Sequence, residues 1–125
     1  MTRALTLGIA AAIGLAGCGG SGGGGKSVTA PAGKPIAVTA KEYSFDPKAI
    51  VVSGGGPVRF NLTNGGAQAH DLHVEKGGQD LGGTAIFSPG QTESATIKLT
   101  PGTYDFVCTV GDHEQLGMKG KLTVK

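Results

Sequence analysis

The 125-residue sequence lacks a marked excess of charge, a long apolar run and any clear helical periodicity. Its 11 Lys and Arg residues are scattered and nearly balanced by nine Asp and Glu residues, so no strong field of one sign would attract nucleic acid. The uncharged apolar run from Ala4 to Leu15 is shorter than the about 20 residues that a membrane-spanning helix needs. No internal repeat is visible. The length allows one small domain, and we expect no nucleic-acid partner for it.

Residues 1–17 have the layout of an export signal. Met1-Thr2-Arg3 is a short basic start, an apolar run follows, and small residues close it immediately before Cys18. The ending Leu15-Ala16-Gly17-Cys18 resembles a bacterial lipobox, which implies that Cys18 becomes the lipid-modified first residue of the mature protein. A plain signal peptide with an incidental cysteine is the alternative. We therefore expect an exported protein, anchored by Cys18 to a membrane of the cell envelope on its periplasmic or extracellular face.

Residues 18–34 are predicted to form a flexible tether. Glycine dominates the start of this stretch, and glycine-rich chains behave as flexible coils. The 17 residues from Gly19 to Pro35 would have a root-mean-square reach of roughly 20–25 Å. A folded domain of residues 35–125 would then lie close above the membrane surface.

Beyond Pro35, short apolar stretches are separated by Gly- and Pro-rich turns. Apolar and polar residues alternate with period two, which is typical of half-buried strands. The expected strands are 36–40, 43–45, 49–52, 58–62, 72–74, 95–99, 104–108 and 121–124. The Gly-rich segment 75–89 has a weak pattern and is expected to be a long excursion across the domain. About seven or eight short strands predict an all-β fold, an antiparallel β-sandwich or small barrel.

One stretch near the C-terminus indicates a metal site, because Cys108, His113 and Met118 follow one another at intervals of five residues. With Cys18 lipid-modified, Cys108 has no disulfide partner, and a lone thiol in an oxidising compartment is expected to be buried or metal-bound. Glycines between the three residues allow the loop to turn their side chains toward one point. A buried inert cysteine and a core methionine are the alternatives.

A further ligand must come from another part of the chain, which has two other histidines, His70 and His73. Residues three apart on a strand face opposite sides. If His70 shares the core face with Leu72 and Val74, then His73 is exposed, and we favour His70 as the ligand; the reverse register remains open. Two imidazoles, a thiolate and a weak thioether suit copper. Zinc would gain little from the thioether, and no carboxylate is placed to complete a tetrahedron.

Three stretches of sequence carry a family resemblance: Tyr43–Pro47 with Ile50–Val52, then Asn64–Leu72, then Tyr104–Leu122. In the most specific of these, aromatic residues precede Cys-x4-His-x4-Met, and glycines flank the methionine. Residues 35–125 thereby resemble the small blue-copper proteins of the plastocyanin/azurin (cupredoxin) family. The resemblance implies an antiparallel Greek-key sandwich that binds one copper ion. It also implies the ligands: His70, Cys108 and His113 in the equatorial plane and Met118 on the axis.

Two positions depart from the family pattern. Gly111-Asp112 stands where members often have Pro-Gly before the second histidine, and Asp71 stands where they often have asparagine after the first. Asp71 can accept a hydrogen bond from Thr109, and its charge would stabilise the oxidised metal. The resemblance further implies that the edge of His113 reaches solvent within a docking patch. We expect that patch to contain Val110, Gly111, Leu116 and Gly117.

The function that the resemblance implies is transfer of single electrons, and with the anchor expected at Cys18 we predict a membrane-anchored monomer that is not an enzyme. Its redox partner would be a cytochrome or another copper protein of the cell envelope. A copper carrier or scavenger with the same ligands is the main alternative, and the rate of copper exchange separates the two. A catalyst related to copper nitrite reductases would need a further all-histidine site, for which only His73 remains. A metal-free domain is disfavoured because all four ligand types are present.

Overall fold

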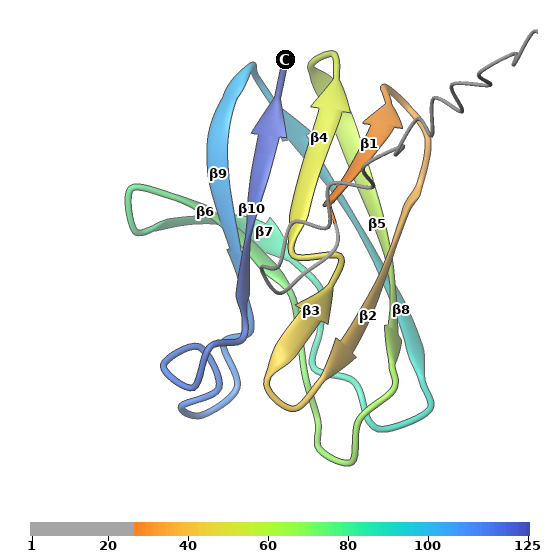
Figure 1. The fold of residues 1–125 in the computed structure, drawn as a ribbon, viewed down its shortest axis with the longest axis vertical. Coiled ribbons are helices and arrows are strands. Elements are labelled where there is room, and N and C mark those ends of the chain that lie inside the picture. The colour runs from red at the N-terminus through yellow and green to blue at the C-terminus, as the bar shows by residue number, and fades with distance from the viewer. Residues whose placement is uncertain (1–26) are drawn as a thin grey trace, which may run out of the picture.

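The alternating segments form two layers of β-strands in the computed structural model, which describes residues 27–125 (Figure 1). One sheet has six strands, in the order β1 (Ser27–Pro31), β4 (Ala49–Ser53), β10 (Lys119–Val124), β9 (Gly102–Val107), β6 (His73–Lys76) and β7 (Gln79–Gly83). The other has four, in the order β3 (Ser44–Asp46), β2 (Ile36–Lys41), β5 (Gly56–Asn64) and β8 (Thr92–Leu99). The prediction of an all-β sandwich is confirmed. None of the described residues forms a helix long and apolar enough to cross a membrane.

Every predicted strand forms, with ends that differ by a few residues, and two strands that were not predicted appear as well. One of these, β7, lies inside segment 75–89. Gly77 and Gly78, with φ angles of 58° and 81°, form a tight turn between Lys76 and Gln79, which pair across the β6–β7 hairpin. The prediction of an excursion is therefore wrong for the first half of this segment.

The other unpredicted strand, β1, moves the start of the domain. It pairs in parallel with β4, from Ser27 opposite Ala49 to Pro31 opposite Ser53. Proline is tolerated here because β1 is an edge strand. The predicted boundary at residue 35 is therefore wrong, since Ser27–Pro31 belongs to the sheet. Residues 18–26, which include Cys18, and the signal segment 1–17 lie outside the described residues.

Strand pairing is mixed, whereas the sequence predicted an antiparallel arrangement. The chain leaves the four-stranded sheet after β3, forms β4 in the other sheet, and returns as β5. Because a crossing separates them, β2 and β5 run parallel rather than as a hairpin. The pairs β1–β4 and β4–β10 are parallel as well, and the remaining pairs are antiparallel.

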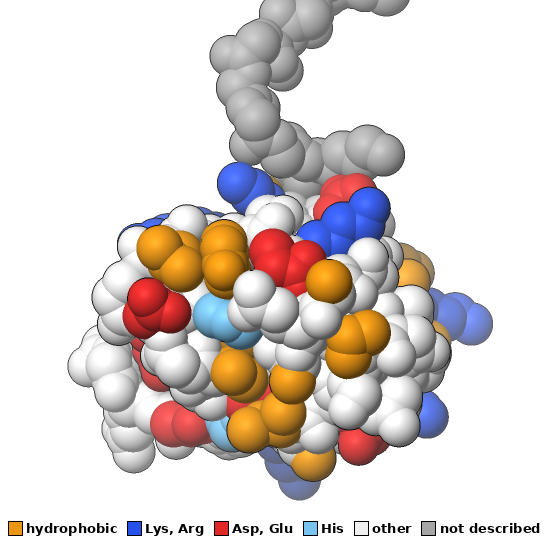
Figure 2. All heavy atoms as spheres, turned by 90° about the horizontal axis from the view of Figure 1, so that it is seen from below, with side chains coloured by type: hydrophobic (Ala, Val, Ile, Leu, Met, Phe, Trp, Pro, Cys, Tyr) orange, Lys and Arg blue, Asp and Glu red, His pale blue; other side chains and the backbone are white. Residues whose placement is uncertain are grey.

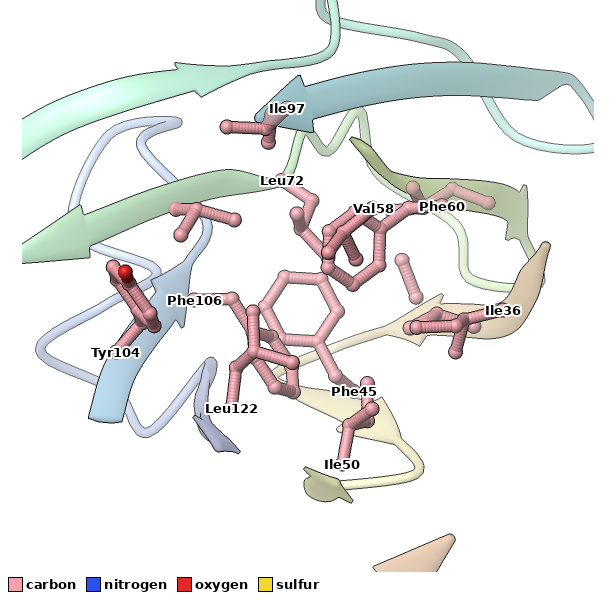
Figure 3. Close-up of a cluster of buried hydrophobic side chains, with 14 of the residues drawn as sticks. Ile36, Phe45, Ile50, Val58, Phe60, Leu72, Ile97, Tyr104, Phe106 and Leu122 are labelled. Atoms are coloured by element: carbon pink, nitrogen blue, oxygen red, sulfur yellow. The ribbon is translucent and has the colours of Figure 1, made fainter. Parts of the chain in front are cut away.

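The core lies between the two sheets and extends to the end of the sandwich that carries the site. Figure 3 shows Phe45, Phe60 and Phe106 side by side in this space, and the rings of Phe45 and Phe106 meet edge to face at 5.4 Å. A Cβ at Gly120 would collide with the ring of Phe106, so glycine lets β10 pass close beside it. Cys108 and Met118 belong to this same buried cluster. The thiol and thioether are therefore held by core packing.

Candidate metal centre

The predicted ligands come from two loops at the lower end of the sandwich in Figure 1. His70 lies between β5 and β6, whereas Cys108, His113 and Met118 lie between β9 and β10. Because β9 and β10 pair antiparallel, they hold the two ends of the second loop together. The backbone N–H of Cys108 donates to the carbonyl of Met118 at 3.1 Å. The residues that carry the thiol and the thioether are thus held side by side by their backbones.

Three of the predicted ligands converge on one point. The ligand atoms of His70, Cys108 and His113 all lie within 4.8 Å of one another, and all three residues are buried. The Cys108 Sγ is 3.9 Å from Nδ1 of His70 and 3.6 Å from Nδ1 of His113. Donors that share one ion at about 2.0–2.3 Å each are separated by such distances. Each histidine therefore presents Nδ1 to the site.

Met118 is fully buried at the close of the same loop. Its backbone N–H donates to the carbonyl of His113 at 3.0 Å. The preceding Gly117 has a φ of 111°, which side-chain-bearing residues avoid, so a glycine is needed for this turn. Residues 113–118 thus fold back on themselves, which returns the chain to β10.

The turn at Gly111-Asp112, where family members often have Pro-Gly, is held by backbone hydrogen bonds. Gly111 has a φ of 50°, and the backbone N–H of His113 donates to the carbonyl of Val110 at 3.1 Å. The N–H of Leu116 donates to the carbonyl of Asp112 at the same distance, 3.1 Å. These bonds fix the position of the second imidazole.

His73 lies outside the metal centre, as the alternation argument predicted. Leu72 and Val74 are fully buried, and His73 between them points to the other face. It is half-buried rather than exposed, because two carboxylates flank its ring. Its Nδ1 is 2.7 Å from Oδ2 of Asp80, and its Nε2 is 3.5 Å from Oδ2 of Asp71.

The predicted link between Asp71 and Thr109 forms. The backbone N–H of Thr109 donates to Oδ1 of Asp71 at 2.6 Å, and the Thr109 hydroxyl donates to the other oxygen. Asp71 is buried, and it follows one predicted ligand while Thr109 follows another. The two ligand loops are thereby joined through a carboxylate.

The residues that contact the outer nitrogen, Nε2, of each imidazole were not predicted from the sequence. Nε2 of His70 is 3.1 Å from Oε1 of Glu42, and Nε2 of His113 is 3.0 Å from Oε1 of Gln68. The side-chain amide of Gln68 also donates to the hydroxyl of Tyr43 at 3.2 Å. No local pattern marks these residues. Glu42 and His70 become neighbours because β2 pairs with β5, and these two strands lead into the segments that carry them. Gln68 and His113 lie on two different loops, β5–β6 and β9–β10.

The pKa values of two side chains at the centre, Glu42 and Cys108, differ from their usual values. Desolvation opposes a charge on the Glu42 carboxylate, but hydrogen bonds from backbone N–H groups and from His70 lower its pKa to about 2. Burial raises the pKa of the Cys108 thiol. A bound cation removes the proton from such a thiol, so metal binding at this site releases a proton.

The end of the molecule that carries the site is partly apolar, as Figure 2 shows from below. Of the predicted docking patch, Leu116 is 51% exposed, Gly111 is exposed, and Val110 and Gly117 are partly exposed. Ile86 is 62% exposed and was not predicted; it precedes Phe87, whose backbone pairs with that of His70. The edge of His113 was expected to reach solvent, but only 6% of this residue is exposed.

The donor set fits copper. Two imidazole nitrogens, a thiol and a nearby thioether are the ligands of mononuclear electron-transfer copper sites. Among the described residues, the cluster that could hold an ion contains no carboxylate ligand, which hard cations would require. The residues present thus form the arrangement of a type 1 site for one copper ion.

Comparisons with known proteins agree with this geometry. A family model described as "Cupredoxin-like domain" matches residues 9–124. A search of curated protein sequences finds no match. A reduced auracyanin from Roseiflexus castenholzii is 27% identical, with a TM-score of 0.67, over 73% of this chain and 96% of that chain.

Two further solved structures are similar. Auracyanin A, described as a blue copper protein from Chloroflexus aurantiacus, is 25% identical, with a TM-score of 0.68, over 77% of this chain and 100% of that chain. Reduced rusticyanin is 25% identical, with a TM-score of 0.61, over 79% of this chain and 84% of that chain.

Proposed function

Because the chain belongs to the family of cupredoxin-like domains, we propose that it is a blue copper protein that transfers single electrons. The observation that carries this proposal is the buried convergence of His70, Cys108 and His113. Copper bound there supplies one-electron chemistry by changing between Cu(I) and Cu(II). The solved auracyanin A, similar over most of this chain, is described as a blue copper protein.

The protein's own contribution is a fixed cage. Core packing holds Cys108 and Met118, and backbone hydrogen bonds hold the turn that carries His113. The outer nitrogens of both imidazoles are engaged by Glu42 and Gln68. Ligands that are held in this way move little when the charge of the metal changes. Little movement means a small reorganisation energy, as transfer of an electron without bond breaking requires.

The setting of this electron transfer is a further part of the proposal. Cys18 would anchor the protein to a membrane of the cell envelope, and a cytochrome or another copper protein would dock as redox partner. Exposed Leu116 and Ile86 would provide apolar contact area on the end nearest the metal. That a shuttle of electrons rather than a catalyst is proposed rests on the similarity to auracyanin A, which is described as a blue copper protein.

The test is to load the mature domain with one equivalent of copper and oxidise it. We expect an intense visible band from the Cys108 thiolate, reversible one-electron reduction, and retention of copper against a strong chelator. Rapid transfer of copper to the chelator, with a reduction that is not reversible, would instead favour a copper carrier. A colourless protein that binds copper elsewhere would refute the proposal.

A further inference from the structure

The two nitrogens of the His70 ring have different partners. Nδ1 points toward the Cys108 Sγ at 3.9 Å, and Nε2 lies 3.1 Å from the carboxylate of Glu42. Since Nδ1 must offer its lone pair to a metal, the ring proton belongs on Nε2, which can then donate to Glu42. His70 is fully buried, whereas the Glu42 side chain is 25% exposed. The carboxylate therefore closes the outer side of the imidazole.

The position of Glu42 is itself fixed by the loop that carries His70. Its Oε1 accepts the backbone N–H groups of Ala67 at 2.8 Å and Gln68 at 2.7 Å. A Cβ at residue 66 would overlap the carboxylate, so Gly66 leaves the space that the carboxylate fills. Glu42 comes from the turn between β2 and β3, which is distant from this loop in the sequence. Three donors from one loop thus converge on a single oxygen.

The other imidazole has a neutral partner. Nε2 of His113 lies 3.0 Å from the amide oxygen of Gln68, which carries no charge. A carboxylate makes the imidazole to which it is hydrogen-bonded a more basic ligand, and an amide does so much less. The two histidines of the centre are therefore not equivalent donors.

We propose that Glu42 is a positioning residue of the copper centre, which fixes the ring orientation and tautomer of His70 and strengthens His70 as a ligand of Cu(II). This inference rests on the proposed function. A more basic imidazole stabilises Cu(II) more than Cu(I), so the carboxylate lowers the reduction potential. Through the N–H groups of Ala67 and Gln68, the same carboxylate also holds the loop in its metal-binding form.

The experiment compares Glu42→Gln with Asp112→Asn. Both changes remove one negative charge near the centre, but no contact joins the Asp112 side chain to a predicted ligand among the described hydrogen bonds and ion pairs. Glu42→Gln keeps an oxygen acceptor at nearly the same place. We expect it to weaken Cu(II) binding by about 10- to 100-fold and Cu(I) binding less, so that the ratio of Cu(II) to Cu(I) affinity falls. This raises the reduction potential by about 59 mV per tenfold.

Asp112→Asn should change this ratio by clearly less than tenfold, which measures the effect of charge alone. Equal shifts in the two variants would overturn the proposal. A lower reduction potential in Glu42→Gln than in the wild type would also overturn the proposal. A second variant, Glu42→Ala, removes the acceptor and should speed hydrogen exchange of the Ala67 and Gln68 amides while the sheet amides stay protected.

A measurement on the metal-free protein separates this inference from the proposed function. Nitrogen-15 NMR of the imidazoles at pH 8 should show the Nε2–H tautomer of His70 in the wild type, and a mixture of tautomers in Glu42→Ala. The Zn²⁺ affinity should fall in parallel. If the copper-loaded wild type were colourless, the proposed function would fail, yet these readouts would still test Glu42. An unchanged tautomer and Zn²⁺ affinity in Glu42→Ala would overturn the inference even if the protein is blue.

Discussion

The carboxylate of Asp71 accepts the backbone N–H of Thr109 at 2.6 Å and thereby joins the two loops of the metal centre. Its second oxygen accepts the Thr109 hydroxyl and lies 3.5 Å from Nε2 of His73. Because Asp71 is buried, its charge is little screened by solvent. A negative charge is therefore held close to two of the residues that bind copper in our proposal.

Asp71→Asn should raise the reduction potential of the copper-loaded protein. The asparagine oxygen can still accept the Thr109 N–H, so the loops stay joined, but the charge that stabilises the oxidised metal is lost. Voltammetry of both proteins checks this. Thr109→Val is the control, because it removes only the hydroxyl. An Asp71→Asn potential equal to or below that of the wild type, with the fold intact, contradicts the expectation.

Substitution of His70 and substitution of His73 should have different effects on the visible band of the copper-loaded protein. His70→Ala should abolish the visible band, because a buried donor within reach of the thiol is lost. His73→Ala should leave the band nearly unchanged, since His73 contacts Asp80 and Asp71 on the opposite face. Absorbance after titration with copper is the measurement. Equal loss of colour in both variants would show that the ligand is misassigned.

Met118→Leu should still bind copper and remain coloured. The three stronger donors are unaffected, and leucine fills the same buried space with a change of volume that cores tolerate. Loss of the thioether should raise the reduction potential, because removing one donor weakens the binding of the more highly charged Cu(II) more than that of Cu(I). Cys108→Ser should instead remove the visible band, which belongs to the thiolate. If Met118→Leu loses copper while its residual site keeps the wild-type potential, Met118 serves retention, and the carrier function gains support.

Cys18→Ser should release the protein from membranes or leave its signal segment uncleaved. Serine cannot form the thioether through which a lipobox cysteine is lipid-modified. Membrane fractionation and intact mass of the purified protein are the measurements. An unmodified mature N-terminus that begins beyond Cys18 in the wild-type protein would rule out the anchor.

Glu75→Gln should stabilise the protein at neutral pH. Glu75 pairs across strands with Asp105 on one side and Asp80 on the other, and like charges placed opposite each other destabilise a sheet. Desolvation and the charges of Glu114, Asp80 and Asp105 raise the pKa of Glu75 above its usual 4.5. The folded state thus holds this proton more tightly than the unfolded state. The resulting destabilisation is absent below pH 4.5 and grows as the pH rises through the folded pKa.

For Glu75→Gln we expect the free energy of unfolding to increase by about 0.2–1 kcal/mol at pH 7. The effect is small because solvent screens charges near the surface. Urea unfolding at pH 7 and pH 4 measures it, and the difference between the proteins should shrink at the lower pH. Glu93→Gln, on the other sheet, is the control. A gain that is larger at pH 4 than at pH 7 would contradict the argument.

Much of the metal centre could be predicted from the sequence, because its pattern is local. Cys108, His113 and Met118 lie in one loop whose glycines permit the required turns, so short sequence distances bring them together. His70 could be separated from His73 because strand residues alternate between two faces, and burial of Leu72 and Val74 fixes the register. Alternation likewise predicted eight of the strands, for which side-chain periodicity is sufficient.

The remaining features were decided by contacts between distant segments. From the sequence, Ser27–Pro31 was predicted to be part of a glycine-rich tether. It forms a strand because the free edge of β4 supplies its hydrogen-bond partners. Glu42 reads as an ordinary turn residue, and it meets His70 because the parallel register of β2 and β5 places the two loops together. Hydrogen bonds between strands join backbone groups that nearly all residues share, so they do not depend on which side chains the strands carry. Which strands become neighbours therefore depends on how the whole core packs, and it cannot be predicted from a local sequence pattern.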